Sequence, residues 1–259
     1  MKCSERKIIG NEKLGKDYYL LKYESQFSEK SIVPGQFISI SLNSEAMVLR
    51  RPFSIFDVNS NVVSVFYKKV GKGTCILAEK KKGELINVLE VLGKGFSFYD
   101  KDRSLAVVSG GIGVAPLYFL AKRLRSMEKD VFIYLGARTE LELFFEDDLK
   151  KMGCSVCVTT DDGSKNICGT VCCGLEPDCE KNNFDRIYAC GPKPMLKAVA
   201  GVADKANILC EVSMEEVMGC GFGVCLGCAV KIKTKETNPI YKMVCKDGPV
   251  FDSQEIDWE

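Results

Sequence analysis

Residues 1–98 alternate apolar and polar positions over short stretches that are separated by turn-forming residues. The alternation is clear in residues 36–42 and recurs less regularly in residues 63–68. Gly, Pro and Asn interrupt the segment at residues 34–35, 59–61, 71–73 and 93–95. Short strands at this spacing are typical of an antiparallel barrel or sandwich. We therefore predict such a domain over residues 1–98, with one short helix near residues 75–80.

From about residue 100 the chain changes to unbroken apolar runs that alternate with helically spaced apolar residues. Residues 105–108 show no alternation, which is typical of a strand that is buried on both faces. The pattern predicts further strands at residues 131–135, 154–159 and 184–190, and helices at residues 116–127, 141–151 and 194–206. This rhythm indicates an α/β domain with a parallel sheet and crossover helices over residues 99–208.

Residues 209–259 form a third region of different character. Gly and Cys dominate residues 219–228, and a strand-like stretch follows at residues 229–233. A polar loop at residues 235–238 separates it from a second short stretch at residues 241–245. We expect a small cysteine-rich segment after the two domains.

Composition narrows the chemistry that these regions can carry. The chain has 14 cysteines and no histidine, and 36 Lys and Arg against 35 Asp and Glu give a formal net charge of +1. The charge balance excludes a strongly basic nucleic-acid-binding protein. The absence of histidine excludes Ser-His-Asp catalysis, Cys-His catalysis and histidine-ligated zinc. The cysteines are therefore buried apolar residues, disulfide partners or ligands of a soft metal.

The expected compartment favours metal binding over disulfides. No apolar stretch of signal-peptide length follows the charged beginning of the chain. The longest uncharged run, residues 104–121, contains glycines and a proline, so we expect a strand, a loop and a helix rather than a membrane span. We therefore expect a cytoplasmic protein, in which thiols stay reduced and clustered cysteines bind metal.

Four cysteines have the spacing of an iron–sulfur site. Cys220, Cys225 and Cys228 form a C-x4-C-x2-C motif, and Cys245 follows after sixteen intervening residues. Three thiolates on one tight loop and one distant thiolate are the ligand pattern of a plant-type [2Fe–2S] cluster. A four-thiolate zinc site is the alternative, but such sites usually have two C-x2-C pairs and this motif has one. The spacing therefore favours a [2Fe–2S] cluster.

A glycine-rich turn lies between a predicted strand and a predicted helix. Gly110, Gly111 and Gly113 allow a phosphate to approach the backbone N–H groups at the start of that helix. Pro116 takes the place of the third glycine in the dinucleotide fingerprint G-x-G-x-x-G, and Arg138 follows the second strand where an acid is expected. The turn therefore predicts a phosphate site, disfavours a Rossmann dehydrogenase and leaves the choice between NAD and NADP open.

Two further motifs have open interpretations when each is taken alone. The sequence RPFS at residues 51–54 is either a basic turn or an anion clamp beside an aromatic ring, which suits a flavin nucleotide. The sequence CGP at residues 190–192 ends a predicted strand and is by itself a turn with a buried cysteine.

Together these motifs resemble those of the ferredoxin–NADP reductase superfamily, in the same order and over almost the whole chain. Residues 51–54 are similar to its flavin motif, Gly111-x-Gly113-x-x-Pro116 to its pyridine-nucleotide loop, and residues 190–192 to its C-G-P element near the nicotinamide. The resemblance implies three parts in order. They are an antiparallel FAD-binding β-barrel over residues 1–98, an NAD-binding α/β domain over residues 99–208 and a [2Fe–2S] segment over residues 209–259.

Within that superfamily, residues 214–228, 245–251 and 160–164 resemble the electron-transfer subunits of dihydroorotate dehydrogenase B. This implies an FMN-containing catalytic partner subunit that oxidises dihydroorotate to orotate in pyrimidine (UMP) biosynthesis. It also implies a heterotetramer with two copies of each subunit. Electrons would pass from FMN through the [2Fe–2S] cluster to FAD here, and as hydride to NAD+.

The resemblance also assigns roles to individual residues. FAD is expected to contact Arg51, Pro52, Phe53, Ser54, Phe66, Tyr67, Lys68, Gly73 and Thr74. NAD is expected to contact Gly110, Gly111, Gly113, Pro116, Cys190, Gly191 and Pro192. The expected cluster ligands are Cys220, Cys225, Cys228 and Cys245. No catalytic acid or base is expected, because the cofactors carry the chemistry.

Other functions share these motifs. The FAD/[2Fe–2S] subunit of a sulfide dehydrogenase or of an NADH–ferredoxin:NADP oxidoreductase has the same build, and a zinc-stapled redox-sensing module could keep the fold without being an enzyme. The other nine cysteines are expected to be core or surface thiols. A second metal site between Cys168 and Cys179 is disfavoured, because the adjacent Cys172 and Cys173 would point in different directions on a strand.

Overall fold

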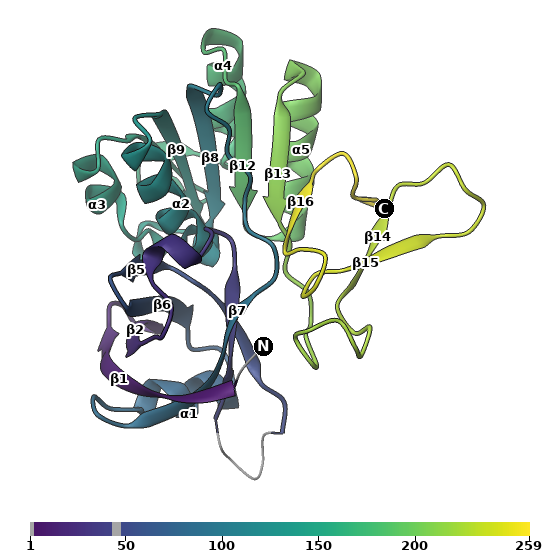
Figure 1. The fold of residues 1–259 in the computed structure, drawn as a ribbon. Coiled ribbons are helices and arrows are strands. Elements are labelled where there is room, and N and C mark those ends of the chain that lie inside the picture. The colour runs from purple at the N-terminus through teal and green to yellow at the C-terminus, as the bar shows by residue number, and fades with distance from the viewer. Residues whose placement is uncertain (1–2, 43–47) are drawn as a thin grey trace.

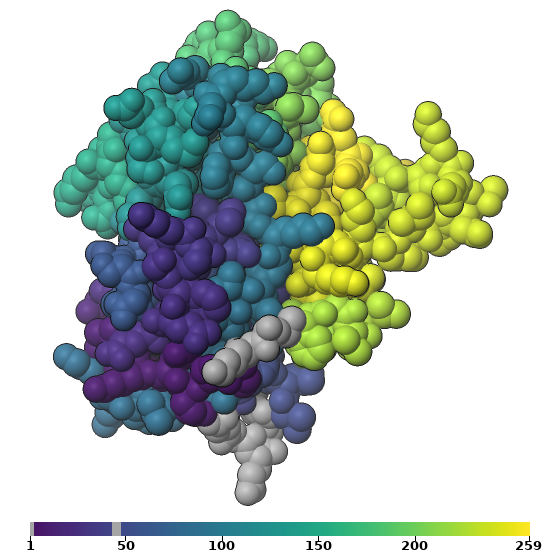
Figure 2. All heavy atoms as spheres, in the orientation of Figure 1, coloured from purple at the N-terminus to yellow at the C-terminus, as the bar shows by residue number. Residues whose placement is uncertain are grey.

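The computed structural model describes residues 3–42 and 48–259, which form two large sheets and a C-terminal segment. The first sheet lies below the second in Figure 1, and the C-terminal segment projects from one side of the molecule. Figure 2 shows the end of the chain, in yellow and yellow-green, packed along the flank of the two domains and projecting beyond them. Among the described residues, no helix is long and apolar enough to cross a lipid bilayer.

The first sheet has the strand order β4-β3-β7-β1-β2-β6-β5, and all its neighbouring strands are antiparallel. Its strands are β1 (Cys3–Lys13), β2 (Tyr18–Glu24), β3 (Phe37–Ser41), β4 (Arg51–Ser54), β5 (Asp57–Asn59), β6 (Val62–Lys68) and β7 (Leu85–Leu92). Its helical elements are η1 (Glu29–Ser31) and α1 (Lys72–Glu79). Phe53 of β4 lies edge-on against Tyr67 of β6, 5.7 Å between ring centroids, so the β4 edge curls round to β6. The predicted antiparallel N-terminal domain is confirmed.

Strand β6 shows why its alternation is weak in the sequence. Val63, Val65 and Tyr67 face the interior of the first domain. Phe66 points to the opposite face and packs against residues of the second domain. Both faces of β6 are therefore covered, one by its own barrel and one by the neighbouring domain.

The second sheet has the strand order β11-β10-β9-β8-β12-β13-β16. Its strands are β8 (Ser104–Gly110), β9 (Asp130–Ala137), β10 (Ser155–Thr160), β11 (Ile167–Cys168), β12 (Arg186–Cys190), β13 (Leu209–Ser213) and β16 (Val250–Asp252). The helical elements between them are η2 (Gly111–Gly113), α2 (Val114–Ser126), η3 (Glu140–Glu142), α3 (Glu146–Lys151), α4 (Cys172–Lys181) and α5 (Lys193–Ala206). The pairings are parallel except for β13 with β16, which confirms the predicted parallel sheet.

Strand β8 is covered on both faces, as its unbroken apolar run predicts. Leu105 and Val107 pack in one cluster with the apolar face of α2. Ala106 and Val108 pack in the other cluster, with α4 and α5. All four side chains are at most 1% exposed, and burying a Val or Leu side chain contributes about 1.5–3 kcal/mol. This central strand therefore anchors the sheet from which the glycine-rich turn emerges.

Some elements differ from the predictions, and the strands β11, β13 and β16 were not predicted. The predicted helix at residues 141–151 is wrong in its first half: the turn η3 is followed by Phe145 at φ +65°, and α3 begins only at Glu146. The physical reason is that Phe144 and Phe145 leave the helical path to pack on Tyr18 and Phe66 of the first domain. Helix α4 was not predicted, because its sequence is rich in Cys and contains Gly and Pro.

The segment at residues 209–259 contributes to the second sheet as well as carrying the cysteine motif. Strand β13 pairs with β12, and β16 pairs with β13. A separate two-stranded hairpin consists of β14 (Ala229–Ile232) and β15 (Ile240–Met243). The division of the chain at residues 98/99 and 208/209 stays a prediction.

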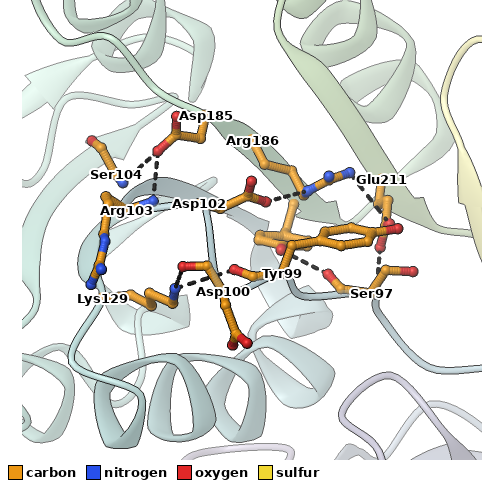
Figure 3. A network of polar contacts seen from close by, with 11 residues as sticks. Ser97, Tyr99, Asp100, Asp102, Arg103, Ser104, Lys129, Asp185, Arg186 and Glu211 are labelled. Carbon is orange, nitrogen blue, oxygen red and sulfur yellow. Dashed lines mark hydrogen bonds and ion pairs between the residues drawn. The ribbon is translucent and has the colours of Figure 1, made fainter.

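A buried polar network fastens the linker between the two large sheets to the second sheet (Figure 3). Arg186 at the start of β12 pairs with Asp102 (Nε to Oδ2, 3.1 Å) and with Glu211 (Nη1 to Oε1, 3.6 Å). The backbone N–H of Ser97 donates to Glu211 Oε2 at 2.9 Å, and the Arg186 guanidinium lies 4.7 Å from the centre of the Tyr99 ring. These contacts hold the linker in one place and so help to fix how the domains are oriented.

Candidate functional site

The first cavity, of about 370 Å³, lies where strands β4 and β6 face the second domain, and we call it the β4–β6 cavity. Eight of the nine residues predicted to bind FAD line it: Arg51, Pro52, Phe53, Ser54, Phe66, Tyr67, Lys68 and Thr74. The ninth, Gly73, is buried inside helix α1 and does not line it. Its volume lies in the ordinary range of ligand pockets.

Positively charged and hydrogen-bonding side chains line this cavity, among them Arg51, Lys68 and Thr74. The Arg51 guanidinium is held by the Leu49 carbonyl, which accepts a hydrogen bond at 2.6 Å. Thr74 lies in the first turn of α1, where its hydroxyl accepts hydrogen bonds from the N–H groups of Val70 and Gly71. A helix start with unpaired N–H groups, together with Arg51 and Lys68, suits a pyrophosphate.

The second cavity, of about 660 Å³, lies at the carboxyl ends of the parallel strands, and we call it the sheet-end cavity. It is bounded by Gly110 at the end of β8, and by the residues that follow the next strands: Arg138 after β9, Asp161 after β10 and Gly191 after β12. From β8 the chain proceeds to β9 on one side and returns to β12 on the other side. Ligands of open α/β sheets bind at such a switch point, outside the carboxyl ends of the strands.

The residues predicted to bind NAD divide into two groups. Gly110, Gly111, Gly191 and Pro192 line the sheet-end cavity. Gly113, Pro116 and Cys190 do not line it, because they are buried in the packing between the turn η2, helix α2 and the end of β12. These three residues support the cavity wall from behind.

Cys190 is 1% exposed, and desolvation by burial raises the pKa of its thiol strongly. Deprotonating it would place an unscreened negative charge inside the protein, so the thiol stays protonated. Cys190 is therefore not available as a nucleophile.

The two cavities meet. Lys68, Ile112 and Glu215 line both of them. The Glu215 side chain reaches the surface, but protein atoms lie around most of it. The resulting desolvation raises the pKa of its carboxyl. A molecule in the sheet-end cavity would therefore lie beside a molecule in the β4–β6 cavity, with these three side chains at the border between them.

Several lining residues were not predicted from the sequence. In the β4–β6 cavity they include Ser213, which ends β13, and Met214, Glu215 and Met218, which follow it. A strand prediction at residues 209–213 would have placed them at the ligand-binding edge of the sheet. In the sheet-end cavity they include Tyr18, Arg138, Glu142 and Asp161.

The four motif cysteines lie in two close pairs in the C-terminal segment. Cys228 Sγ lies 3.2 Å from Cys245 Sγ, and the backbone N–H of Cys220 lies 3.4 Å from Cys225 Sγ. All four are free thiols. Among the described residues, no three Cys, Asp or Glu side chains are arranged as the ligands of a single metal ion.

Backbone N–H groups surround the cysteine sulfurs. Cys220 Sγ accepts from the N–H groups of Phe222, Val224 and Cys225 at 3.3–3.5 Å. Gly223 donates to Cys245 Sγ at 3.0 Å. Desolvation raises the pKa of Cys220, but these backbone hydrogen bonds outweigh it and lower the pKa to about 6.

This donor set suits an iron–sulfur cluster. Four soft sulfurs are present, and N–H groups directed at cluster sulfurs stabilise their negative charge. The loop also packs close to the first domain, since the nearest atoms around Gly221 belong to Ser39 and Leu92. The segment that leads into the loop, through Met214 and Met218, lines the β4–β6 cavity. The cysteine site and this cavity are therefore neighbours.

Comparison with known proteins finds two family models that match different parts of the chain. Residues 107–201 match the model of the oxidoreductase NAD-binding domain. Residues 215–257 match the model of the iron–sulfur cluster binding domain of dihydroorotate dehydrogenase B. Among solved structures, an NADH-dependent reduced ferredoxin–NADP oxidoreductase is 31% identical with a TM-score of 0.86, over 98% of this chain and 90% of that one. A flavohemoglobin from Malassezia yamatoensis, 18% identical over 80% of this chain and 58% of that one with a TM-score of 0.67, shares the fold.

Two full-length relatives carry the same name, dihydroorotate dehydrogenase B (NAD(+)), electron transfer subunit. The one from Caldanaerobacter subterraneus subsp. tengcongensis is 36% identical over 96% of each chain. The one from Fusobacterium nucleatum subsp. nucleatum is 37% identical over the whole of both chains. The resemblance found in the sequence is confirmed, and the chain belongs to the family of dihydroorotate dehydrogenase B electron-transfer subunits.

Proposed function

We propose that this chain takes electrons from a dihydroorotate-oxidising partner subunit and passes them to NAD+ in pyrimidine (UMP) biosynthesis. The observation that carries the proposal is the continuity of the three sites. The cysteine loop adjoins the β4–β6 cavity, and that cavity shares Lys68, Ile112 and Glu215 with the sheet-end cavity. A route for electrons needs such neighbouring sites, and a hydride can pass only between groups in contact.

Each of these sites has residues that suit a different cofactor. Arg51 and the start of α1 bind the FAD pyrophosphate in the β4–β6 cavity, while Pro52, Phe53 and Ser54 line the place of its ring system. Gly110, Gly111 and Gly191 admit NAD at the sheet-end cavity. FAD, when bound, exchanges electron pairs with NAD+ as hydride and single electrons with the [2Fe–2S] cluster.

The protein's own groups position the cofactors and need not move protons. Cys220, Cys225, Cys228 and Cys245 hold the cluster. Cys190 stays protonated behind the sheet-end cavity, where it shapes the wall near the nicotinamide. The chemistry requires no side-chain base, which agrees with a chain that has no histidine.

The partner contacts the surface of the cysteine loop. Val217, Val224 and Leu226, on the cysteine loop and just before it, are 83%, 72% and 64% exposed. Exposed apolar side chains in one place favour a protein interface. We propose an FMN-containing catalytic subunit as partner and a heterotetramer with two copies of each subunit. The cytoplasm is the proposed location, because it keeps the cysteines reduced.

Co-expression with the catalytic subunit tests the proposal. The purified complex should oxidise dihydroorotate with NAD+ as acceptor and show flavin and iron–sulfur absorbance. The chain alone should reduce dyes with NADH and should not oxidise dihydroorotate. Dihydroorotate oxidation by the chain alone, or a chain with zinc and no flavin, would overturn the assignment.

A second candidate is supported by the structural comparison. The NADH-dependent reduced ferredoxin–NADP oxidoreductase shares 31% identity and a TM-score of 0.86 with this chain. The two functions differ in the electron source. NADH-dependent reduction of NADP+ by reduced ferredoxin, without any response to dihydroorotate in the co-purified complex, would favour this second function.

A further inference from the structure

Arg138 occupies the position at which nucleotide-binding sheets carry the residue that contacts the adenosine ribose. It follows β9, which is the first strand after the glycine turn and the second strand of the α/β domain, and it lines the sheet-end cavity. At this position an acid that binds the ribose 2′-hydroxyl is typical of NAD sites, and an arginine that binds a 2′-phosphate is typical of NADP sites. Arg138 taken alone therefore points to NADP, against the family to which the chain belongs.

The surroundings of Arg138 change this expectation. Its guanidinium makes a two-point contact with Glu142, Nη2 to Oε1 at 2.6 Å and Nε to Oε2 at 3.0 Å. Lys68 from the first domain reaches the same carboxylate, Nζ to Oε1 at 3.0 Å. The Arg138 side chain is 71% exposed and that of Glu142 is 18% exposed, and a pair that is open to water on its arginine side contributes little to stability. What the contact does change is the set of donors that remain for a ligand.

Acidic side chains outnumber basic ones in the lining of this cavity, because Glu215 lines it as well. Lys68 and Arg138 face Glu142 and Asp161, and all four side chains line the cavity. Hydrogen bonds from Arg138, and then from Lys68, lower the pKa of Glu142 to about 2, so its carboxylate stays ionised at physiological pH. A 2′-phosphate brings a charge of about −2, and it would have to displace a carboxylate from the fork of Arg138.

We propose that Glu142 sets the coenzyme preference of this chain by occupying Arg138 and Lys68 and repelling a 2′-phosphate. The proposal rests on the proposed function, because it presumes that the sheet-end cavity binds a pyridine nucleotide. The coenzyme preference would then arise from repulsion between Glu142 and the 2′-phosphate as well as from contacts to the preferred nucleotide. Replacing Glu142 by glutamine removes one negative charge, keeps the shape and releases the cations for the phosphate.

The test compares the full-length chain with Glu142→Gln, with Glu140→Gln and with Glu142→Gln/Arg138→Ala. Glu140 lies in the same turn η3, is exposed and does not line the cavity, so its variant matches the charge change. The probes are 5′-ADP and 2′,5′-ADP, which differ in the 2′-phosphate, with dissociation constants measured by calorimetry. NADH- and NADPH-dependent dye reduction provides a second readout.

We expect Glu142→Gln to strengthen 2′,5′-ADP binding relative to 5′-ADP by about tenfold or more, as a new two-point charge-assisted contact implies. Glu140→Gln should leave the ratio unchanged, and removing Arg138 in the double variant should abolish the gain. An unchanged ratio in Glu142→Gln, with 5′-ADP still bound, would overturn this inference and leave the proposed function intact. Failure of the unmodified chain to bind 5′-ADP would overturn the proposed function itself.

Discussion

Gly113 lies directly against the carbonyl oxygen of Cys190, so closely that a Cβ at residue 113 would overlap it. Gly113 ends the turn η2 and Cys190 ends β12. The two elements meet at the switch point of the sheet, where the sheet-end cavity opens. The glycine of the fingerprint therefore allows the turn to close over the end of β12, and its contribution to nucleotide binding is indirect.

Gly113→Ala should destabilise the protein by about 3 kcal/mol, because the atoms that the new methyl group meets are backbone and cannot rotate away. The free energy of unfolding in urea measures this. Gly201→Ala is the control: it lies in helix α5 with no atom within 4 Å of a built Cβ, and alanine should stabilise a helix interior by up to about 1 kcal/mol. Equal stability of the Gly113→Ala variant and the unmodified chain would contradict the close packing.

Arg186→Ala should cost about 3–5 kcal/mol, because it leaves the carboxylates of Asp102 and Glu211 buried without their partner. Arg103→Ala removes the same charge from an exposed side chain next to the linker and should change stability by less than about 0.5 kcal/mol. Unfolding in urea distinguishes the two. Similar values for both variants would show that the network in Figure 3 does not hold the linker.

The sequence predicted the elements whose patterns are set locally. Residues 105–108 are apolar without interruption because strand β8 has helices on both faces. The cysteine spacing predicted the cysteine loop, because three of the four motif cysteines lie within residues 220–228. In both cases the information is carried by neighbouring residues.

What the sequence did not predict depends on contacts between distant segments. Phe145 leaves the helical path because Phe66, far away along the chain, offers it a ring to pack on. Glu215 reaches both cavities only because β13 pairs with β12. Arg138 alone suggested a phosphate site, and only the structure places the carboxylate of Glu142 across it. No local pattern carries such information.

Arg51→Ala should weaken FAD binding about 10- to 100-fold, because a charge-assisted hydrogen bond to a phosphate contributes about 1.5–3 kcal/mol. The dissociation constant follows from flavin fluorescence on titration of the flavin-free chain. Lys72→Ala is the control, since Lys72 is an exposed cation at the start of α1 that does not line the β4–β6 cavity. If Lys72→Ala weakened binding as much as Arg51→Ala, general charge attraction would explain the effect.

Cys225→Ser should abolish the iron–sulfur absorbance and leave the flavin absorbance, because the alkoxide of serine is a far weaker ligand for a soft metal. Cys168→Ser should change neither spectrum, although Cys168 is equally exposed and belongs to the other dense group of cysteines. Iron and sulfide analysis gives the cluster content of each variant. Loss of the cluster in Cys168→Ser, or its retention in Cys225→Ser, would contradict the ligand set.

Val224→Glu should prevent assembly with the catalytic subunit while the isolated chain keeps its flavin, its cluster and its NADH-dependent dye reduction. Val224 is 72% exposed, so the charge costs the fold little, but an apolar interface would have to bury it without a partner. Leu141→Glu is the matched control, because Leu141 is 86% exposed on the turn η3 of the second domain. Gel filtration and dihydroorotate-dependent reduction of NAD+ report assembly. Since electrons enter through the cysteine loop, a complex that still forms with Val224→Glu and transfers electrons at the normal rate would place the interface elsewhere.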